Sequence, residues 1–127
     1  MQFKGYEPFE LEFHFTCDTE NVIYALTCQG CGENYIGKTE REVRRRCGEH
    51  RHNVEKVLGN ETPCQHVHEH LATCGEGEFV MTPFFKVSDD DNIFAQEKAF
   101  IQHYKPRLNV RQSQRLLEKR NMHSGSK

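Results

Sequence analysis

VIYALTCQGCGENYIG, residues 22–37, predicts the centre of the fold. Residues 22–27 and 33–37 carry the β-branched, aromatic and aliphatic side chains that are typical of strands. The CQGCG between them is short enough for a hairpin turn, and Gly30 and Gly32 are expected to supply the positive φ angles that such turns use. The stretch therefore predicts two antiparallel strands joined by a turn that carries two cysteines.

The two cysteines of this turn have the spacing of half a zinc site. Cys28 and Cys31 are separated by two residues, as paired thiolate ligands are in tetrahedral zinc centres. The other ligands are expected from CQHVHEHLATC, residues 64–74, where side chains four apart share one face of a helix. We favour His70 and Cys74, because they fall near the helix end, where the chain can turn toward the hairpin. Alternatives stay open, among them buried thiols without a metal and sets that include His66, Cys17 or Cys64.

A helix carrying a cation and an imidazole is predicted to follow the hairpin. Residues 39–42 (TERE) fit a capping box, and the apolar stripe continues to Gly59-Asn60, which ends the helix. Arg46 and His50 are four residues apart and therefore share a face. Such a pair can bind a phosphodiester, with the guanidinium contacting two oxygens. The alternative is a solvated, charge-rich face, which is favoured by the neighbouring Arg41, Arg44, Arg45 and Arg51.

A carboxylate interrupts the apolar stripe of another helix, predicted over residues 93–104. Glu97 follows Ile93 by four residues and so falls inside that stripe. A carboxylate in this position is costly unless it is paired, exposed at an edge or bound to a metal. A hard oxygen ligand suits Mg²⁺, which commonly uses one or two carboxylates together with phosphate oxygens of the substrate. Edge exposure and a metal site are both open on the residues alone.

Hydrophobic periodicity and Gly/Pro signals place the remaining elements, with strands at 9–15, 79–87 and 108–110 and helices at 62–71 and 112–120. Thr62-Pro63 would open the first of these helices, and Pro83 marks an edge or a bulge in its strand. The expected fold class is α+β, with a small central antiparallel sheet flanked by helices and a zinc-bound hairpin. The expected organisation is a strand extension at 1–20, one domain at 21–110 and a charged tail at 111–127.

The composition excludes several classes of protein. The chain of 127 residues is long enough for one modest core, and its formal net charge of −2 gives no global basic field for nucleic acid. No apolar run approaches the roughly 20 residues that span a bilayer, and the charged N-terminus does not read as a signal peptide. The six cysteines are therefore expected to be thiols or metal ligands of an intracellular protein, nuclear if the chain is eukaryotic.

In their order along the chain, these motifs resemble the GIY-YIG nuclease family. Val22-Ile23-Tyr24 matches the first motif with Val in the Gly place, and Tyr35-Ile36-Gly37 is an intact second motif. The later motifs follow at fitting positions: Arg46 with His50, Glu97, and Pro106 to Asn109. The cysteine pair between the tyrosine motifs resembles in particular the zinc-knuckle branch found in Penelope-like retroelement endonucleases.

The resemblance implies a metal-dependent DNA endonuclease. Tyr24 would help to take the proton from the attacking water, with His50 as a further candidate, and Tyr35 would position the water or a phosphate oxygen. Arg46 would neutralise charge on the phosphoryl oxygens, Glu97 would hold Mg²⁺ or Mn²⁺, and Asn109 would support the site. A tyrosine base near neutral pH would need cations that lower its pKa.

Local cations would contact the DNA backbone, chiefly Lys38, Arg41, Arg44, Arg45 and Arg51, with further support from Lys56, Arg107, Arg111, Arg115, Lys119 and Arg120. The structural Zn²⁺ would hold the hairpin. The rival hypothesis is a non-catalytic, zinc-stabilised module that binds nucleic acid or protein on the same fold. A thiol-redox protein using Cys28 and Cys31 is a weaker third hypothesis, because that motif usually opens a helix.

Overall fold

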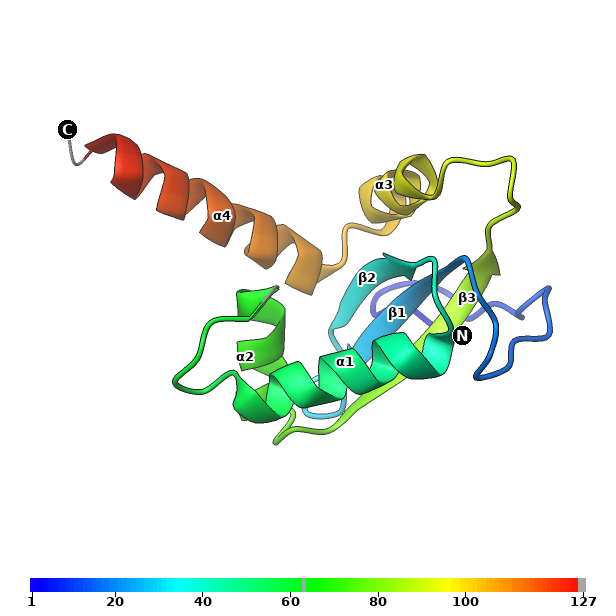
Figure 1. Ribbon diagram of the computed structural model, residues 1–127, viewed down its shortest axis with the longest axis horizontal. Coiled ribbons are helices and arrows are strands. Elements are labelled where there is room, and N and C mark those ends of the chain that lie inside the picture. The colour runs from blue at the N-terminus through cyan, green and yellow to red at the C-terminus, as the bar shows by residue number, and fades with distance from the viewer. Residues whose placement is uncertain (63, 126–127) are drawn as a thin grey trace.

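Three antiparallel strands form the centre of the protein in the computed structural model (Figure 1). β1 (Val22–Cys28) lies between β2 (Asn34–Thr39) and β3 (Phe79–Lys86). β1 pairs with β2 in the register Tyr24 to Gly37, so the hairpin predicted over residues 22–37 is confirmed. The two tyrosine motifs are therefore neighbours across one pair of strands.

The structure describes residues 1–62 and 64–125, and of residues 118–125 it describes the backbone alone. Within these ranges four helices accompany the sheet: α1 (Val43–Lys56), α2 (Gln65–Thr73), α3 (Ile93–Tyr104) and α4 (Arg107–Gly125). The expected α+β class, a central antiparallel sheet flanked by helices, is confirmed. In the described ranges, no helix combines the length and the apolar character that crossing a membrane requires.

β1 is buried on both faces, because its side chains alternate between two apolar clusters. Ile23 and Ala25 lie in the first cluster, with side chains from the N-terminal segment and α3: Phe3, Phe9, Phe100, Ile101 and Tyr104. Tyr24 and Leu26 lie in the second, with side chains from α1, α2 and α4: Val54, Val67, Leu71 and Leu108. The strand thus directs Tyr24 toward the face that α1 and α2 cover.

β3 carries the predicted irregularity at proline. Its register with β1 shifts between Ile23 and Tyr24, and Pro83 stands opposite Tyr24. β3 is an outer strand of the sheet. Proline has no N–H to donate to a neighbouring strand, and an outer strand or a bulge tolerates that loss. The prediction of an edge or a bulge at Pro83 is therefore confirmed.

The strand predicted over residues 9–15 is wrong, since none of these residues, all of which the structure describes, is in a strand. The Phe9 ring packs against Phe3 and Phe84, and the Phe9 N–H donates to the Met1 carbonyl. Leu11 and Phe13 remain exposed. The apolar alternation here reflects the packing of rings, because a strand also needs a partner for its backbone groups and β3 does not provide one.

The predicted capping box is also wrong. Thr39 is the last residue of β2, and its hydroxyl accepts from the Arg41 N–H at 3.1 Å in the turn that follows. α1 therefore begins later, at Val43, and no side chain caps it. The helix ends at Lys56, so Leu58 lies beyond the stripe and is 64% exposed.

Two further helix boundaries differ from expectation. Residues 108–110 form the start of α4 rather than a strand, because Leu108 packs fully buried in the second cluster. α2 begins at Gln65, and Pro63, which was expected to open it, lies outside the described residues. α4 continues across residue 110, so no break in secondary structure marks the predicted boundary of the tail, which stays a prediction.

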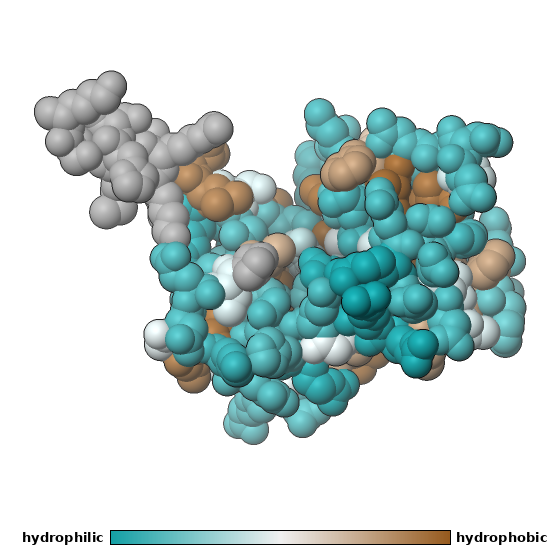
Figure 2. Space-filling view, in the orientation of Figure 1, coloured by the Kyte–Doolittle hydropathy of each residue, from teal (hydrophilic) through white to brown (hydrophobic). Residues whose placement is uncertain are grey.

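The surface over α1 is mainly hydrophilic, whereas hydrophobic atoms gather near α3 in the same view (Figure 2). The arginine-rich side of α1, which was expected to be solvated, is thus exposed to solvent. The opposite side of α1 carries Val43, His50 and Val54, which are buried.

Candidate active site and metal centre

Tyr24, His50 and Arg46 meet at the face of β1 that α1 covers. Tyr24 Oη and His50 Nε2 share a hydrogen bond of 2.5 Å, and Arg46 Nε donates to the same Oη at 3.2 Å. Tyr24 and His50 are each 0% exposed. A Cβ on Gly37 would lie 2.5 Å from Tyr24 Oη, so the glycine of the second tyrosine motif makes room for the hydroxyl of the first.

Burial dominates the electrostatics of this group. It raises the pKa of Tyr24 well above its usual value, because the opposing effect of Arg46 is smaller. It also lowers the pKa of His50 to about 3, and the charges of Arg46 and His68 add to that shift. In the free protein the tyrosine is therefore protonated and the imidazole neutral. From the sequence, a nearby cation was expected to lower the pKa of the tyrosine. Arg46 acts in that direction, but its effect on the pKa of Tyr24 is smaller than that of burial.

The buried neutral imidazole predicts acid sensitivity of the fold. His50 has a pKa of about 3 in the folded protein against 6.5 for an ordinary histidine, so between these values the unfolded chain binds the extra proton. The free energy of unfolding should therefore fall as the pH falls through this window, by up to about 1.4 kcal/mol per pH unit. Between about pH 7 and about pH 5 the contribution of His50 is about 2 kcal/mol. Urea denaturation of wild type and His50→Gln across this range measures it.

Other groups, including His66 and His70, titrate with lowered pKa values in both proteins, so the difference between the two slopes isolates His50. The wild type should show the steeper dependence on pH. Equal slopes in the two proteins would contradict the assignment of a buried neutral His50.

Tyr35 comes from β2 and lies on the same side of the sheet. Its hydroxyl is 3.3 Å from Cys64 Sγ, and its ring centroid is 6.5 Å from that of His50. Burial and then Cys64 raise its pKa well above the usual value. Cys64, which was left open as a zinc ligand, is thus a neighbour of the second tyrosine.

Glu97 lies on α3 and is ion-paired. Its Oε1 is 3.7 Å from Lys38 Nζ, and its side chain is 20% exposed. Burial raises the pKa of Glu97, while Lys38 and Arg46 act against that shift. A single, partly buried carboxylate fits Mg²⁺, which keeps several waters and needs few protein ligands. Edge exposure and a metal site thus both stay open for Glu97, and its partner Lys38 lines a pocket on the surface.

That pocket has a volume of about 300 Å³ and joins the cations to an exposed aromatic ring. Its lining residues are Lys38, Thr39, Glu40, Arg41, Arg46 and Phe94. Phe94 is 62% exposed, and Lys38 Nζ lies 4.5 Å from its ring centroid. No sequence pattern singled out Phe94, because only the fold brings its ring to Lys38. A phosphate group bound in this pocket would meet positive charge from both β2 and α1.

Asn109 forms hydrogen bonds with the backbone at the outer edge of β2. Its Oδ1 accepts from the Ile36 N–H at 2.7 Å, and its Nδ2 donates to the Ile36 carbonyl at 2.9 Å. β2 is an outer strand, so these two backbone groups would otherwise lack a strand partner. Asn109 thereby fixes the residue between Tyr35 and Gly37 from the first turns of α4.

Several cations that were predicted to contact DNA already have partners. Three ion pairs form, Lys38 with Glu97, Arg41 with Glu49 and Arg44 with Asp18. Arg45 is exposed, and the Arg51 guanidinium lies 5.9 Å from the centroid of the Phe79 ring. Exposed ion pairs contribute little stability, so phosphate groups can compete for these side chains.

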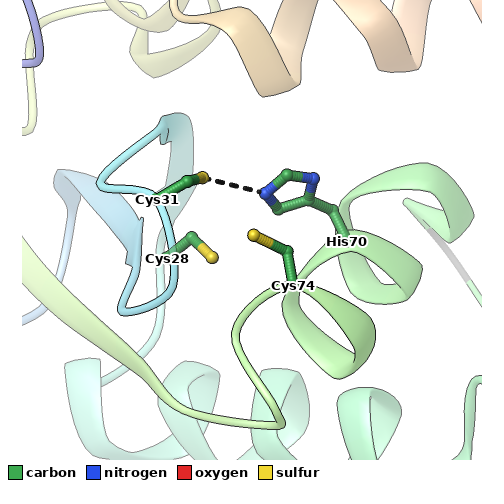
Figure 3. A group of neighbouring side chains, drawn as sticks. All are labelled: Cys28, Cys31, His70 and Cys74. Atoms are coloured by element: carbon green, nitrogen blue, oxygen red, sulfur yellow. Dashed lines mark hydrogen bonds between the residues drawn. The ribbon is translucent and has the colours of Figure 1, made fainter.

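A second group of side chains gathers at the turn of the hairpin. Cys28 ends β1, Cys31 lies in the turn, His70 is on α2 and Cys74 is its C-cap. Their four ligand atoms lie within 4.8 Å of one another, and Figure 3 shows all four side chains pointing into one space. The structure thus assembles the set that the sequence favoured. Among the described residues, neither Cys17, Cys64 nor His66 belongs to this cluster.

The donor set and its spacing fit zinc. Three thiols and one imidazole are a common structural zinc set, and ligand atoms of a tetrahedral site with zinc–sulfur bonds of about 2.3 Å lie about 3.8 Å apart. Cys31 Sγ and His70 Nε2 are 3.2 Å apart. Hydrogen bonding with Cys31 raises the pKa of Cys74 to about 11. A bound cation would reverse that effect and stabilise the thiolates.

Two glycines permit the close approach of the two halves of this centre. A Cβ on Gly30 would lie 2.0 Å from the Cys74 carbonyl oxygen, and one on Gly75 would lie 3.2 Å from Cys28 Sγ. Gly32 has the expected positive φ of +78°, but Gly30 does not. Gly30 is needed for space rather than for a left-handed backbone, which corrects the expectation for this residue.

Sequence reasoning missed one histidine. His68 Nε2 lies 3.0 Å from His50 Nδ1, and His68 is 1% exposed. The histidines of residues 64–74 were weighed only as metal ligands, by their spacing along a helix. Two positions separate His68 from His70, so the helix turns them toward different neighbours.

Comparison with protein families gives one match, in which the family described as GIY-YIG catalytic domain covers residues 20–110. Comparisons with curated proteins and with solved structures found no match.

Proposed function

This chain belongs to the GIY-YIG catalytic domain family, and we propose that it is an endonuclease that hydrolyses DNA phosphodiester bonds with the help of Mg²⁺. The family itself indicates a nuclease, and hence a nucleic acid substrate. The observation that carries the finer proposal is the contact of Tyr24 Oη with both His50 and Arg46, beside a pocket lined by cations.

Tyr24 is the group proposed to activate water. As its own proton moves to His50 Nε2, Tyr24 Oη takes a proton from the attacking water. The water oxygen bonds to phosphorus while the bond from phosphorus to the leaving oxygen breaks, and the leaving oxygen departs as an alkoxide that takes a proton from solvent. The hydrogen bond of 2.5 Å supports this transfer, since the acceptor nitrogen is already in contact with the hydroxyl. The neutral state of His50 leaves a lone pair available for that proton. Tyr35 is proposed to position the water or a phosphate oxygen from the neighbouring strand.

Arg46 is proposed to stabilise the charge that develops on the phosphoryl oxygens. The Arg46 side chain lines the pocket, and its Nε donates a hydrogen bond to Tyr24 Oη. One side chain can therefore contact both the proposed base, Tyr24, and a phosphate group in the pocket. The chemistry that Mg²⁺ or Mn²⁺ supplies at Glu97 is charge stabilisation of the leaving oxygen. Lys38 would release Glu97 to that cation and turn toward a phosphate group of the DNA.

Cys28, Cys31, His70 and Cys74 are proposed to bind a structural Zn²⁺ that fixes the hairpin against α2. Because two of these ligands lie between the two tyrosine motifs, we also propose that the chain belongs to the zinc-knuckle branch found in Penelope-like retroelement endonucleases. Their position in the hairpin supports this assignment.

Cleavage of supercoiled plasmid tests the proposal. The wild type with Mg²⁺ or Mn²⁺ is expected to relax or linearise the plasmid, and chelation of the divalent ion should stop the reaction. Arg46→Ala should cleave about a hundred-fold more slowly, because loss of one donor to developing charge costs about this factor. Arg45→Ala is the matched control, since it removes the adjacent, exposed arginine of the same helix. As a predicted contact to the DNA backbone, its loss should weaken DNA binding but leave the rate at saturating protein concentration near that of wild type.

An intact plasmid across a range of divalent ions would instead favour the rival function, a zinc-stabilised module that binds without cleavage. The ion pair between Lys38 and Glu97 favours that alternative, because it occupies the carboxylate proposed to hold the metal. Binding of labelled DNA by the wild type, measured beside the cleavage assay, separates a binding module from an inactive preparation.

A further inference from the structure

The hydrogen bonds of the candidate active site continue beyond His50 into α2. His50 Nδ1 lies 3.0 Å from His68 Nε2, and His68 Nδ1 lies 2.8 Å from Thr62 Oγ1. Thr62 Oγ1 in turn is 3.5 Å from Gln65 Oε1. A chain of polar groups thus runs from the fully buried Tyr24 to the partly exposed Thr62.

The contacts at the outer end of this chain favour one direction. Gln65 Oε1 accepts from the Thr62 backbone N–H at 2.6 Å, so this atom must be the amide oxygen. The other amide atom, Nε2, agrees, because it donates to the Asn60 carbonyl at 3.2 Å and to a Glu69 carboxylate oxygen at 2.8 Å. With this oxygen 3.5 Å away as an acceptor for its hydrogen, the Thr62 hydroxyl can accept from His68 Nδ1 at 2.8 Å.

Each link then determines the next. If Thr62 Oγ1 accepts, His68 carries its proton on Nδ1 and presents the lone pair of Nε2 to His50. His50 must then carry its proton on Nδ1, which leaves the lone pair of His50 Nε2 facing Tyr24. Tyr24 consequently donates to His50, while one lone pair of its Oη accepts the Arg46 Nε–H.

In the opposite tautomer of His50, the hydroxyl hydrogen of Tyr24 would lose its partner. With a proton on Nε2, His50 would donate to Tyr24 Oη together with Arg46, and the hydroxyl hydrogen would need a third partner. Among the described residues, the hydrogen bonds recorded for Tyr24 Oη are those to His50 and Arg46. Both ends of the chain therefore favour the same arrangement of protons.

We propose that His68, anchored by Thr62 and Gln65, is a positioning residue that holds His50 in the tautomer able to accept the Tyr24 proton. The proposal deepens the proposed nuclease function and rests on it. His68 touches neither substrate nor metal in this role, and it acts through the ring of His50. For histidines that bind a metal, removal of the second polar partner that orients the ring typically costs about 10–100-fold in metal affinity or activity, and a factor of this size is expected for His50.

The test compares His68→Leu, which removes the acceptor, with His68→Gln, whose side-chain oxygen can still accept from His50 Nδ1–H. We expect His68→Leu to lower kcat for plasmid cleavage by about 10–100-fold with little change in KM for DNA. His68→Gln should recover most of that loss. His66→Leu is the matched control, since it makes the same change on the same helix outside the chain, and its rate should stay near wild type.

A second readout needs no substrate. Long-range proton–nitrogen NMR of the imidazole rings should find the His50 proton on Nδ1 in wild type and His68→Gln, and a mixture of tautomers in His68→Leu. If His68→Leu fails to fold or to retain zinc, Thr62→Val removes the outer anchor instead, and it should slow cleavage and shift the His50 tautomer in the same direction.

Two results would overturn the inference: an unchanged kcat in folded His68→Leu, or a wild-type His50 proton on Nε2. Failure of the proposed function has a different signature. In that case the wild type would not cleave DNA at all, while the NMR spectra would still report the tautomer of His50 and decide the arrangement of the chain.

Discussion

Replacement of Glu97 by glutamine is expected to slow DNA cleavage by about a thousand-fold. The change keeps the size of the side chain but removes the negative charge that would hold Mg²⁺. Metal stabilisation of a phosphoryl transition state supplies several kcal/mol, and about 4 kcal/mol corresponds to a factor of about 1,000 in rate. Single-turnover cleavage of a labelled duplex or plasmid in saturating Mg²⁺ measures the effect.

Glu40→Gln is the matched control for this prediction. Glu40 is exposed and lines the same pocket as Lys38, the ion-pair partner of Glu97, so the control removes a charge of the same kind from the same region. The control should cleave near the wild-type rate, and both variants should bind DNA in Ca²⁺ at least as well as the wild type, because each removes a negative charge. Wild-type cleavage by Glu97→Gln would contradict a metal site at this residue.

Loss of one ligand of the cysteine cluster is expected to cost the protein its zinc and much of its stability. Purified wild type should contain about one zinc per chain, and Cys31→Ala should contain much less. A loss of about 3 kcal/mol is expected, and at about 4 °C per kcal/mol for a chain of this size the Tm should fall by about 10 °C or more. Metal analysis and thermal denaturation, with and without a chelator, measure both effects.

Cys17→Ala and Cys47→Ala are the controls for the zinc centre, since both cysteines lie outside the cluster. Each should keep zinc and a Tm near that of wild type, which would also remove Cys17 from the possible ligands. Wild type that is folded and free of zinc, or a Cys31→Ala variant that keeps a full complement of zinc, would show that the cluster is not a zinc centre.

The metal centre and the tyrosine site are connected by α2. The helix presents His70 and its cap Cys74 to the hairpin, while His68 lies buried against His50. A zinc ion that fixes α2 to the turn of the hairpin would therefore also fix the position of His68. A single short helix can therefore carry the candidate zinc ligands His70 and Cys74 as well as His68, which contacts the candidate catalytic His50.

Local patterns were sufficient to predict the parts of the fold that depend on neighbours in sequence. The hairpin was predicted because a short glycine-bearing turn separates two apolar runs. The pairing of Arg46 and His50 on one face, and of His70 with Cys74, followed from the period of a helix. The helix at residues 93–104 was predicted with the bounds that α3 has, because Asn92 caps its first turn and Pro106 follows its end.

The errors arose where a local pattern had more than one structural cause. Phe9, Phe13 and Phe15 alternate with polar residues as a strand would, yet only a partner for the backbone makes a strand. Thr39 begins a sequence that resembles a capping box, but pairing with Val22 keeps it in β2. In both cases tertiary partners decided between alternatives that were equally good locally.

The hairpin, the spacing of the cysteines and the helical faces that carry the candidate catalytic residues depend on geometry within a few residues, so the local pattern was enough to predict them. Which histidine faces which centre depends on packing between distant segments. His66, His68 and His70 lie at alternate positions of one stretch, and they have different neighbours because α2 packs against α1, α4 and the turn of the hairpin. Contacts between distant segments set the tautomer of His50 and the burial of Tyr24, and no local pattern encodes them.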